Sequence, residues 1–170
     1  MSSSQQLTKL LSEGIRLSRS SIFNLLRTEL SGGLMNIDKF KHQHTDIISC
    51  ISILRALVRS GIAANAADIS QAIISMSSTI KLHLAVEDKI LYPALQNANN
   101  ASLARMGKKF QDEMTSIAAA YVNFARKWNT ASTVSQNPEE FRADANSVLK
   151  VLYNRMRKED TDFYPVIEAY

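Results

Sequence analysis

Apolar residues recur at alternating steps of four and three positions along most of the chain. In residues 36 to 60 this spacing links Phe40 to Ile47, with His44 filling the intermediate place. It is the period of one face of an α-helix that packs along a seam. The same pattern recurs in residues 67 to 95, 101 to 128 and 138 to 164. The sequence therefore predicts an all-α fold, an up-and-down antiparallel four-helix bundle.

Turn-forming residues separate these stretches. Glycine, asparagine and proline gather at positions 31 to 33, 61 to 65, 97 to 100 and 129 to 138. These residues end helices and form short connections, which favour antiparallel neighbours. Before the first break, leucine and isoleucine recur at helical spacing. We therefore expect an amphipathic helical extension over residues 1 to 35, followed by the bundle over residues 36 to 170.

The composition of the chain limits the functional classes to which the protein can belong. The chain has 170 residues, of which 45% are hydrophobic, five are glycine and three are proline, which suits one compact core. The single Cys50 excludes an internal disulfide and the start of the chain lacks a signal peptide's apolar core, so we expect a cytoplasmic protein. No apolar run approaches the roughly 20 residues needed to cross a bilayer. The net charge of +4 comes from scattered residues, so we expect neither membrane nor nucleic-acid binding.

Polar residues occupy several core positions of the predicted seams. His44 lies on the first seam, His83 and Glu87 lie on the second, and Arg155 and Glu159 lie on the fourth. If consecutive helices form hairpins, these residues stand at similar distances from the turns. One layer of the bundle is therefore predicted to contain nearly all the polar core residues.

This layer contains the donor atoms of a metal site. His83 and Glu87 are four residues apart, so their imidazole and carboxylate can converge on one ion. With His44 from the neighbouring helix, they form the two-histidine, one-carboxylate set that non-haem iron(II) uses with open coordination positions. Glu159 is a candidate fourth ligand. The sequence therefore predicts a metal site, with iron as the expected ion.

The two predicted hairpins resemble each other. The frame Glu-Asp-x-x-x-Tyr-Pro begins at Glu87 and again at Glu159. Met114 and Arg155 stand in the second copy where the first copy has its two seam histidines. The second copy therefore offers a carboxylate but no imidazole.

On these residues the chain resembles the hemerythrin-like, or HHE cation-binding, domains. The resemblance covers residues 36 to 168 and rests on His44, His83, Glu87, Tyr92, Pro93, Glu159, Tyr164 and Pro165. It implies a four-helix bundle in which each hairpin supplies a histidine and a His-x-x-x-Glu motif, which together hold two bridged irons. For this chain it implies a metal-binding protein that binds or senses O2, NO or iron, and we expect binding rather than catalysis.

Arg155 changes the expected number of ions. Two buried carboxylates, Glu87 and Glu159, repel each other unless positive charge compensates them. The guanidinium is always protonated and can engage a carboxylate through two hydrogen bonds. We therefore expect Arg155 to supply positive charge in the place of a second ion. The sequence predicts one iron rather than two, next to an Arg155–Glu159 pair.

Several alternatives stay open at this stage. Glu113 is a candidate additional ligand, and Tyr121 lies on the third seam, where it either packs or reaches the site through its hydroxyl. The histidines could instead be core residues that hydrogen-bond to the glutamates in a metal-free interaction module. An oxygen-using mono-iron enzyme is a third alternative. The N-terminal extension could cap the bundle, form a homodimer or dock a partner.

Overall fold

The computed structural model describes residues 37 to 169 as a series of helices. The long helices are α3 (Ile37–Arg59), α4 (Ala66–Val86), α6 (Ala101–Lys127) and α8 (Pro138–Lys158). The short ones are η1 (Glu87–Leu91), α5 (Tyr92–Gln96), α7 (Ala131–Gln136), η2 (Glu159–Phe163) and α9 (Tyr164–Glu168). All regular secondary structure in this part of the chain is helical, which confirms the all-α prediction. The predicted N-terminal extension lies outside the described residues.

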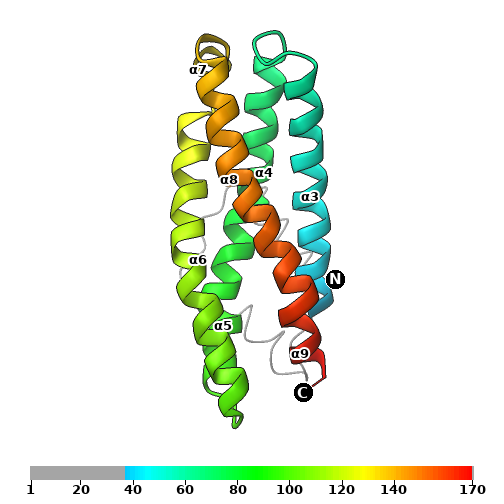
Figure 1. Ribbon diagram of the computed structural model, residues 1–170, viewed down its shortest axis with the longest axis vertical. Coiled ribbons are helices and arrows are strands. Elements are labelled where there is room, and N and C mark those ends of the chain that lie inside the picture. Colours follow the sequence, from blue (N-terminus) through cyan, green and yellow to red (C-terminus); the bar gives the residue numbers. More distant parts are fainter. Residues whose placement is uncertain (1–36, 170) are drawn as a thin grey trace, which may run out of the picture. The chain divides into compact units, whose positions relative to one another are not determined.

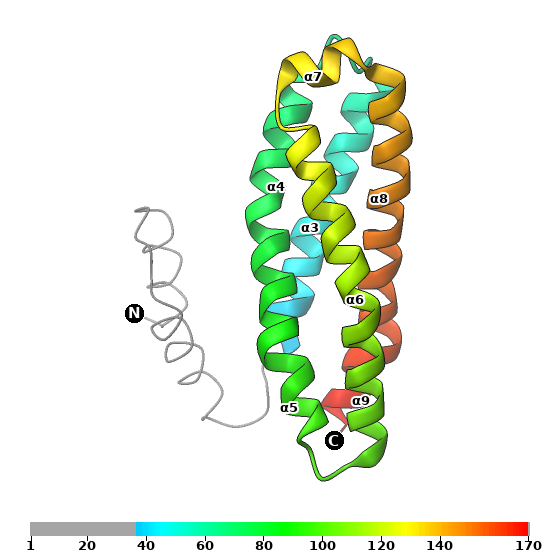
Figure 2. The same ribbon diagram turned by 90° about the vertical axis from the view of Figure 1, so that its left-hand side faces the viewer.

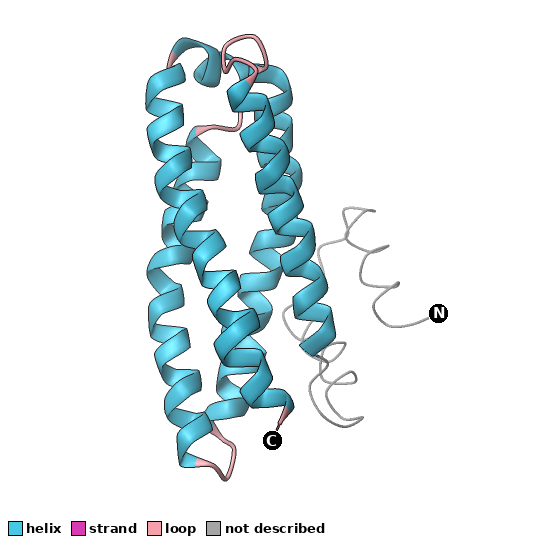
Figure 3. Cartoon of the chain, turned by 45° about the vertical axis from the view of Figure 1, so that its right-hand side comes forward, coloured by secondary structure: helices cyan, strands magenta, loops and turns pink. Residues whose placement is uncertain are grey.

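The long helices lie side by side, and their connections are at the two ends (Figures 1 and 2). Helix α3 contacts α4 and α8, while α6 contacts α4 and α8. Each long helix therefore contacts two others, and the core lies between them. Figure 3 shows loops only where helices end. No helix among residues 37 to 169 is long and apolar enough to cross a membrane.

The predicted seams form this core. The buried apolar side chains include Phe40, Ile47, Ile51, Leu54, Ile69, Ile73, Met76, Ile80, Phe110, Phe124, Phe141 and Leu152. Full burial of such a side chain contributes about 1.5–3 kcal/mol, which drives the helices together. The five polar residues predicted on the same seams, His44, His83, Glu87, Arg155 and Glu159, are buried as well. Apolar packing above and below therefore holds a polar layer inside the protein.

Local signals determine where helices begin and end. The side chain of Asn100 accepts hydrogen bonds from the N–H groups of Ser102 and Leu103 and caps α6, as N-cap residues do. Helix α8 begins at Pro138, whose missing N–H is harmless in a first turn. Gly61 follows α3 with a φ of 114°, which only glycine adopts readily.

Two predicted helices differ from a regular α-helix. The sequence predicts unbroken helices over residues 67 to 95 and 138 to 164, whereas each contains a π-helical turn, η1 or η2. A proline, Pro93 or Pro165, comes soon after each turn and cannot donate the hydrogen bond that would continue the α-helix. Helix α7 also lies where the sequence predicts only a turn, and Thr130 caps it.

Candidate metal centre

The π-helical turns bring the glutamate and the tyrosine of each repeated motif together. The backbone N–H of Tyr92 donates to the carbonyl oxygen of Glu87, and the N–H of Tyr164 donates to that of Glu159. In an α-helix, residue i+5 would be rotated by about 140° from residue i. The wider π-helical turn pairs these residues instead. All four side chains are consequently buried in the same layer.

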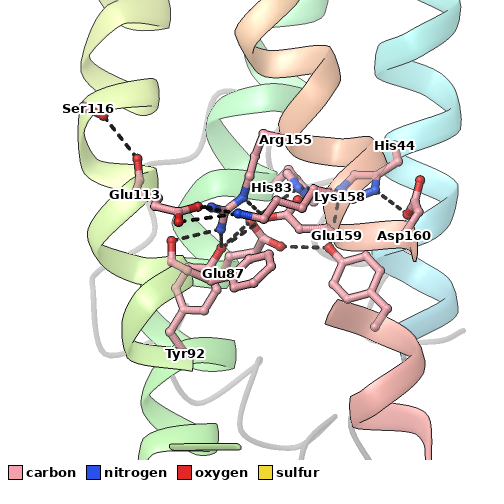
Figure 4. Close-up of polar contacts among 12 residues, drawn as sticks. His44, His83, Glu87, Tyr92, Glu113, Ser116, Arg155, Lys158, Glu159 and Asp160 are labelled. Atoms are coloured by element: carbon pink, nitrogen blue, oxygen red, sulfur yellow. Dashed lines mark hydrogen bonds and ion pairs between the residues drawn. The ribbon is translucent and has the colours of Figure 1, made fainter. Parts of the chain in front are cut away.

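Four candidate ligands converge at this layer. His44 comes from α3, His83 from α4, Glu87 from η1 and Glu159 from η2 (Figure 4). Each is at most 1% exposed, and one ligand atom from each lies within 4.8 Å of the others. Ligands bound at about 2.1 Å from one ion are at most about 4.2 Å apart, so small side-chain movements would bring these atoms onto one ion. The residues therefore form a buried cluster that could hold a metal ion.

The two histidines face each other through the same ring nitrogen. Nδ1 of His44 donates to Oδ1 of Asp160 at 2.7 Å, and Nδ1 of His83 donates to Oε1 of Gln43 at 3.1 Å. Because each Nδ1 carries the proton, each Nε2 presents a lone pair. The two Nε2 atoms are only 3.0 Å apart. The lone pairs repel unless a proton or a metal ion lies between them.

The two ring nitrogens and the partners of their rings suit a metal ion in this gap. Burial, and then repulsion from His44, lower the pKa of His83 to about 3, so the imidazole is neutral at physiological pH. Metal-bound histidines usually donate their other ring N–H to a carboxylate or carbonyl oxygen. Asp160 and Gln43 supply such acceptors here. The donor set therefore fits a metal ion.

Glu159 directs one carboxylate oxygen into the cluster. Its Oε1 accepts hydrogen bonds from Nε of Arg155 and, at 3.3 Å, from the hydroxyl of Tyr92. Its Oε2 is buried without a hydrogen-bond partner and lies 3.4 Å from Nε2 of His44. Burying a charged oxygen without a partner is costly. Oε2 is therefore available to a ligand that the protein itself does not supply.

Glu87 is hydrogen-bonded by the two tyrosines, whereas Arg155 pairs with Glu159. The hydroxyl of Tyr164 donates to its Oε1 at 2.8 Å, and the hydroxyl of Tyr92 approaches its Oε2 at 3.1 Å. Burial, and then the negative charge of Glu159, nevertheless raise the pKa of Glu87 well above its ordinary value. Its Oε2 also lies 3.6 Å from Nε2 of His83. A cation bound there would favour the ionised carboxylate.

Arg155 occupies the other half of the layer. Its Nε donates to Glu159, its Nη1 to Glu113 at 3.1 Å, and its Nη2 to the hydroxyl of Tyr92 at 2.8 Å and the carbonyl oxygen of Phe110 at 2.9 Å. The guanidinium also lies 4.3 Å from the centroid of the Phe110 ring, where the ring face attracts a cation. These contacts hold a permanent positive charge on the Glu159 side of the cluster (Figure 4).

The internal repeat extends to the partners of these residues. Gln43 precedes His44 and accepts from His83, while Glu113 precedes Met114 and accepts from Arg155. A neutral amide thus faces a neutral imidazole, and a carboxylate faces a guanidinium. In the second half of the layer, the residue that pairs with the arginine therefore carries the opposite charge.

The remaining candidates lie outside the four converging ligands. The Glu113 side chain is 38% exposed and pairs with Arg155 and, at 3.1 Å, with Lys158. Tyr121 is buried, but its hydroxyl lies 3.0 Å from the hydroxyl of Ser77, and burial raises its pKa to about 12.

Sequence reasoning did not find the roles of Gln43, Tyr92 and Tyr164. The repeated Tyr-Pro was a signal for the two tyrosines, because it follows the same glutamate in both hairpins. Gln43 gave no signal of its own, since its contact with His83 depends on how α3 packs against α4.

Over residues 37 to 169, the fold and the cluster together define an all-helical domain with buried histidines and glutamates able to hold a metal ion. The family model of the hemerythrin HHE cation-binding domain matches residues 35–167. The chain therefore belongs to this family, which confirms the resemblance found in the sequence. No curated protein and no solved structure matches the chain.

Proposed function

We propose that this chain binds one non-haem iron ion through His44, His83, Glu87 and Glu159. The observation that supports this most strongly is the pair of facing Nε2 atoms, 3.0 Å apart, which can both offer a lone pair to one ion. The partnerless Oε2 of Glu159 adds a third donor atom on the same side. Two imidazoles with carboxylates are a ligand set that suits iron.

We propose one ion rather than two because Arg155 supplies the positive charge that a second ion would otherwise bring to the buried carboxylates. Its guanidinium stands next to Glu159 and is held by Glu113, Tyr92 and the Phe110 carbonyl. One divalent ion and one guanidinium compensate both buried carboxylates without a second metal. The second hairpin also offers no imidazole.

The proposed role is to bind or sense O2, NO or iron status in the cytoplasm. Iron with open coordination positions supplies the capacity to bind a small diatomic ligand. The side chains of the cluster limit what can reach it, because each candidate ligand is at most 1% exposed. Such burial favours a small ligand over a large substrate.

We also infer the topology and organisation that hold this site. An up-and-down antiparallel four-helix bundle is supported by four long helices that lie side by side, with connections alternating between the two ends (Figure 1). Residues 1 to 35 are proposed as a helical extension that caps this bundle or forms a homodimer.

Metal analysis and spectroscopy test the proposal. Full-length protein from iron-supplemented cells should contain about one iron per chain, and its visible absorption should change on exposure to O2 or NO. His83→Ala should lose the iron. His42→Ala is the matched control, because His42 is exposed and contacts the carbonyl oxygen of Asp38. Folded protein without iron would overturn the proposal and favour a metal-free interaction module.

A further inference from the structure

The hydroxyl of Tyr164 lies against two atoms that face the proposed ion. It is 3.3 Å from Nε2 of His44 and 2.8 Å from Oε1 of Glu87. The tyrosine is fully buried, and its ring stacks on the His44 ring with centroids 5.3 Å apart. With the proton of His44 on Nδ1, and with Glu87 ionised as a bound cation would keep it, both neighbours are acceptors, whereas the hydroxyl has one proton to donate. One of these close contacts therefore lacks a proton.

The separations match those between neighbouring ligands of one ion. Two ligands at right angles, each about 2.1 Å from an ion, lie about 3.0 Å apart. The corresponding distances are 3.0 Å between the Nε2 atoms of His44 and His83, and 3.4 Å from Nε2 of His44 to Oε2 of Glu159. The Tyr164 oxygen, at 3.3 Å from the same Nε2 atom, fits the same shell.

We propose that Tyr164 is a fifth ligand of the metal ion and binds through its phenolate oxygen. This inference rests on the proposed function, because it requires the ion. On binding, the ion takes the place of the phenol proton, which is released to water, and no electron is transferred. Oxygen donors suit iron, and tyrosine serves as an iron ligand in some haem proteins.

Tyr92, the counterpart of Tyr164 in the repeat, is held differently. Its hydroxyl accepts a hydrogen bond from Nη2 of Arg155 at 2.8 Å and lies 3.1 Å from Glu87 and 3.3 Å from Glu159. It forms no hydrogen bond with either buried histidine. An oxygen that already accepts from a guanidinium is a poor ligand, because the adjacent positive charge repels a second cation. Tyr92 therefore positions the carboxylates.

Spectroscopy of iron-loaded full-length protein distinguishes the two tyrosines. The wild type, Tyr164→Phe and Tyr92→Phe are loaded with iron(II) and oxidised with ferricyanide. A phenolate on ferric iron gives an intense visible charge-transfer band and enhanced tyrosine vibrations in the resonance Raman spectrum. We expect both features in the wild type and in Tyr92→Phe, and their loss in Tyr164→Phe with iron still bound.

The outcomes separate this inference from the proposed function. Wild-type protein that binds no iron contradicts the proposed function itself. Iron-loaded wild type without the band, or Tyr164→Phe that keeps it, overturns the Tyr164 assignment alone. If Tyr164→Phe does not fold, Tyr92→Phe decides: retention of the wild-type band supports Tyr164, and loss of the band overturns it.

Discussion

Replacing Arg155 with methionine should strongly destabilise the metal-free protein. Arg155 is 4% exposed and pairs with buried Glu159. Methionine keeps much of the packing but leaves that carboxylate without its countercharge. Removing one partner of a buried pair costs about 3–5 kcal/mol. We therefore expect the free energy of unfolding to fall by about that amount, and the melting temperature by roughly 6 to 20 °C.

Lys158→Met is the matched control for this experiment. Lys158 also pairs with Glu113, at 3.1 Å, but its side chain is 38% exposed. Surface pairs contribute about 1 kcal/mol or less. Urea unfolding of both variants, followed by circular dichroism, measures the difference. A loss in Arg155→Met no larger than that in Lys158→Met would refute the reasoning.

The loss of unfolding free energy in Arg155→Met, relative to the wild type, should shrink as the pH falls. Burial alone would raise the pKa of Glu159, but nearby His44 and the charge of Arg155 hold it below its ordinary value. A carboxyl with a lowered folded pKa contributes stability above its unfolded pKa of about 4.3, and this stability is lost as pH falls through the folded pKa. The free energies of unfolding of the wild type and Arg155→Met should therefore differ most near neutral pH. A loss that stays constant down to acidic pH would mean that Glu159 is not its source.

Three further predictions concern single residues and the metal. Burial and Glu159 raise the pKa of Glu87, so its stability contribution is complete below about pH 4.3 and is lost as pH rises through the folded pKa. Glu87→Gln should therefore stabilise the metal-free protein at pH 8 in urea unfolding, while weakening iron binding. Iron(II) at about 100 times its dissociation constant should stabilise the wild type by about 2.7 kcal/mol in anaerobic calorimetry, but not His83→Ala. Tyr121→Phe loses the hydrogen bond to Ser77 and should cost about 1 kcal/mol, and elemental analysis should find unchanged iron.

The helical fold and the polar layer could be predicted because both depend on spacing within single helices. His83 and Glu87 are four residues apart, so the helical period alone places them on one face. The structure brings both together with His44 and Glu159. The Arg155–Glu159 pair, also at a spacing of four, is present as well. The N-terminal helix and its homodimer stay predictions, because they lie outside the described residues.

The surroundings of the cluster could not be predicted because they depend on departures from that spacing. With 3.6 residues per turn, Tyr164 would point about 140° away from Glu159, and only the π-helical turn brings it to the cluster. The proline after each tyrosine is a signal for irregularity, but it does not specify a π-helical turn. Tyr121 was a candidate because it lies on the third seam, and Glu113 because it lies beside Met114, off the seam. The contacts of both depend on how α6 packs against its neighbours.

Anomalous diffraction at the iron absorption edge tests the central claim most directly. Crystals of the iron-loaded, full-length protein should show one peak within the cluster, among the Nε2 atoms of His44 and His83 and the carboxylates of Glu87 and Glu159. No second peak should lie between Arg155 and Glu113, in the half of the layer that the guanidinium occupies. A second peak there, or the absence of a peak among the four ligands, would contradict the account.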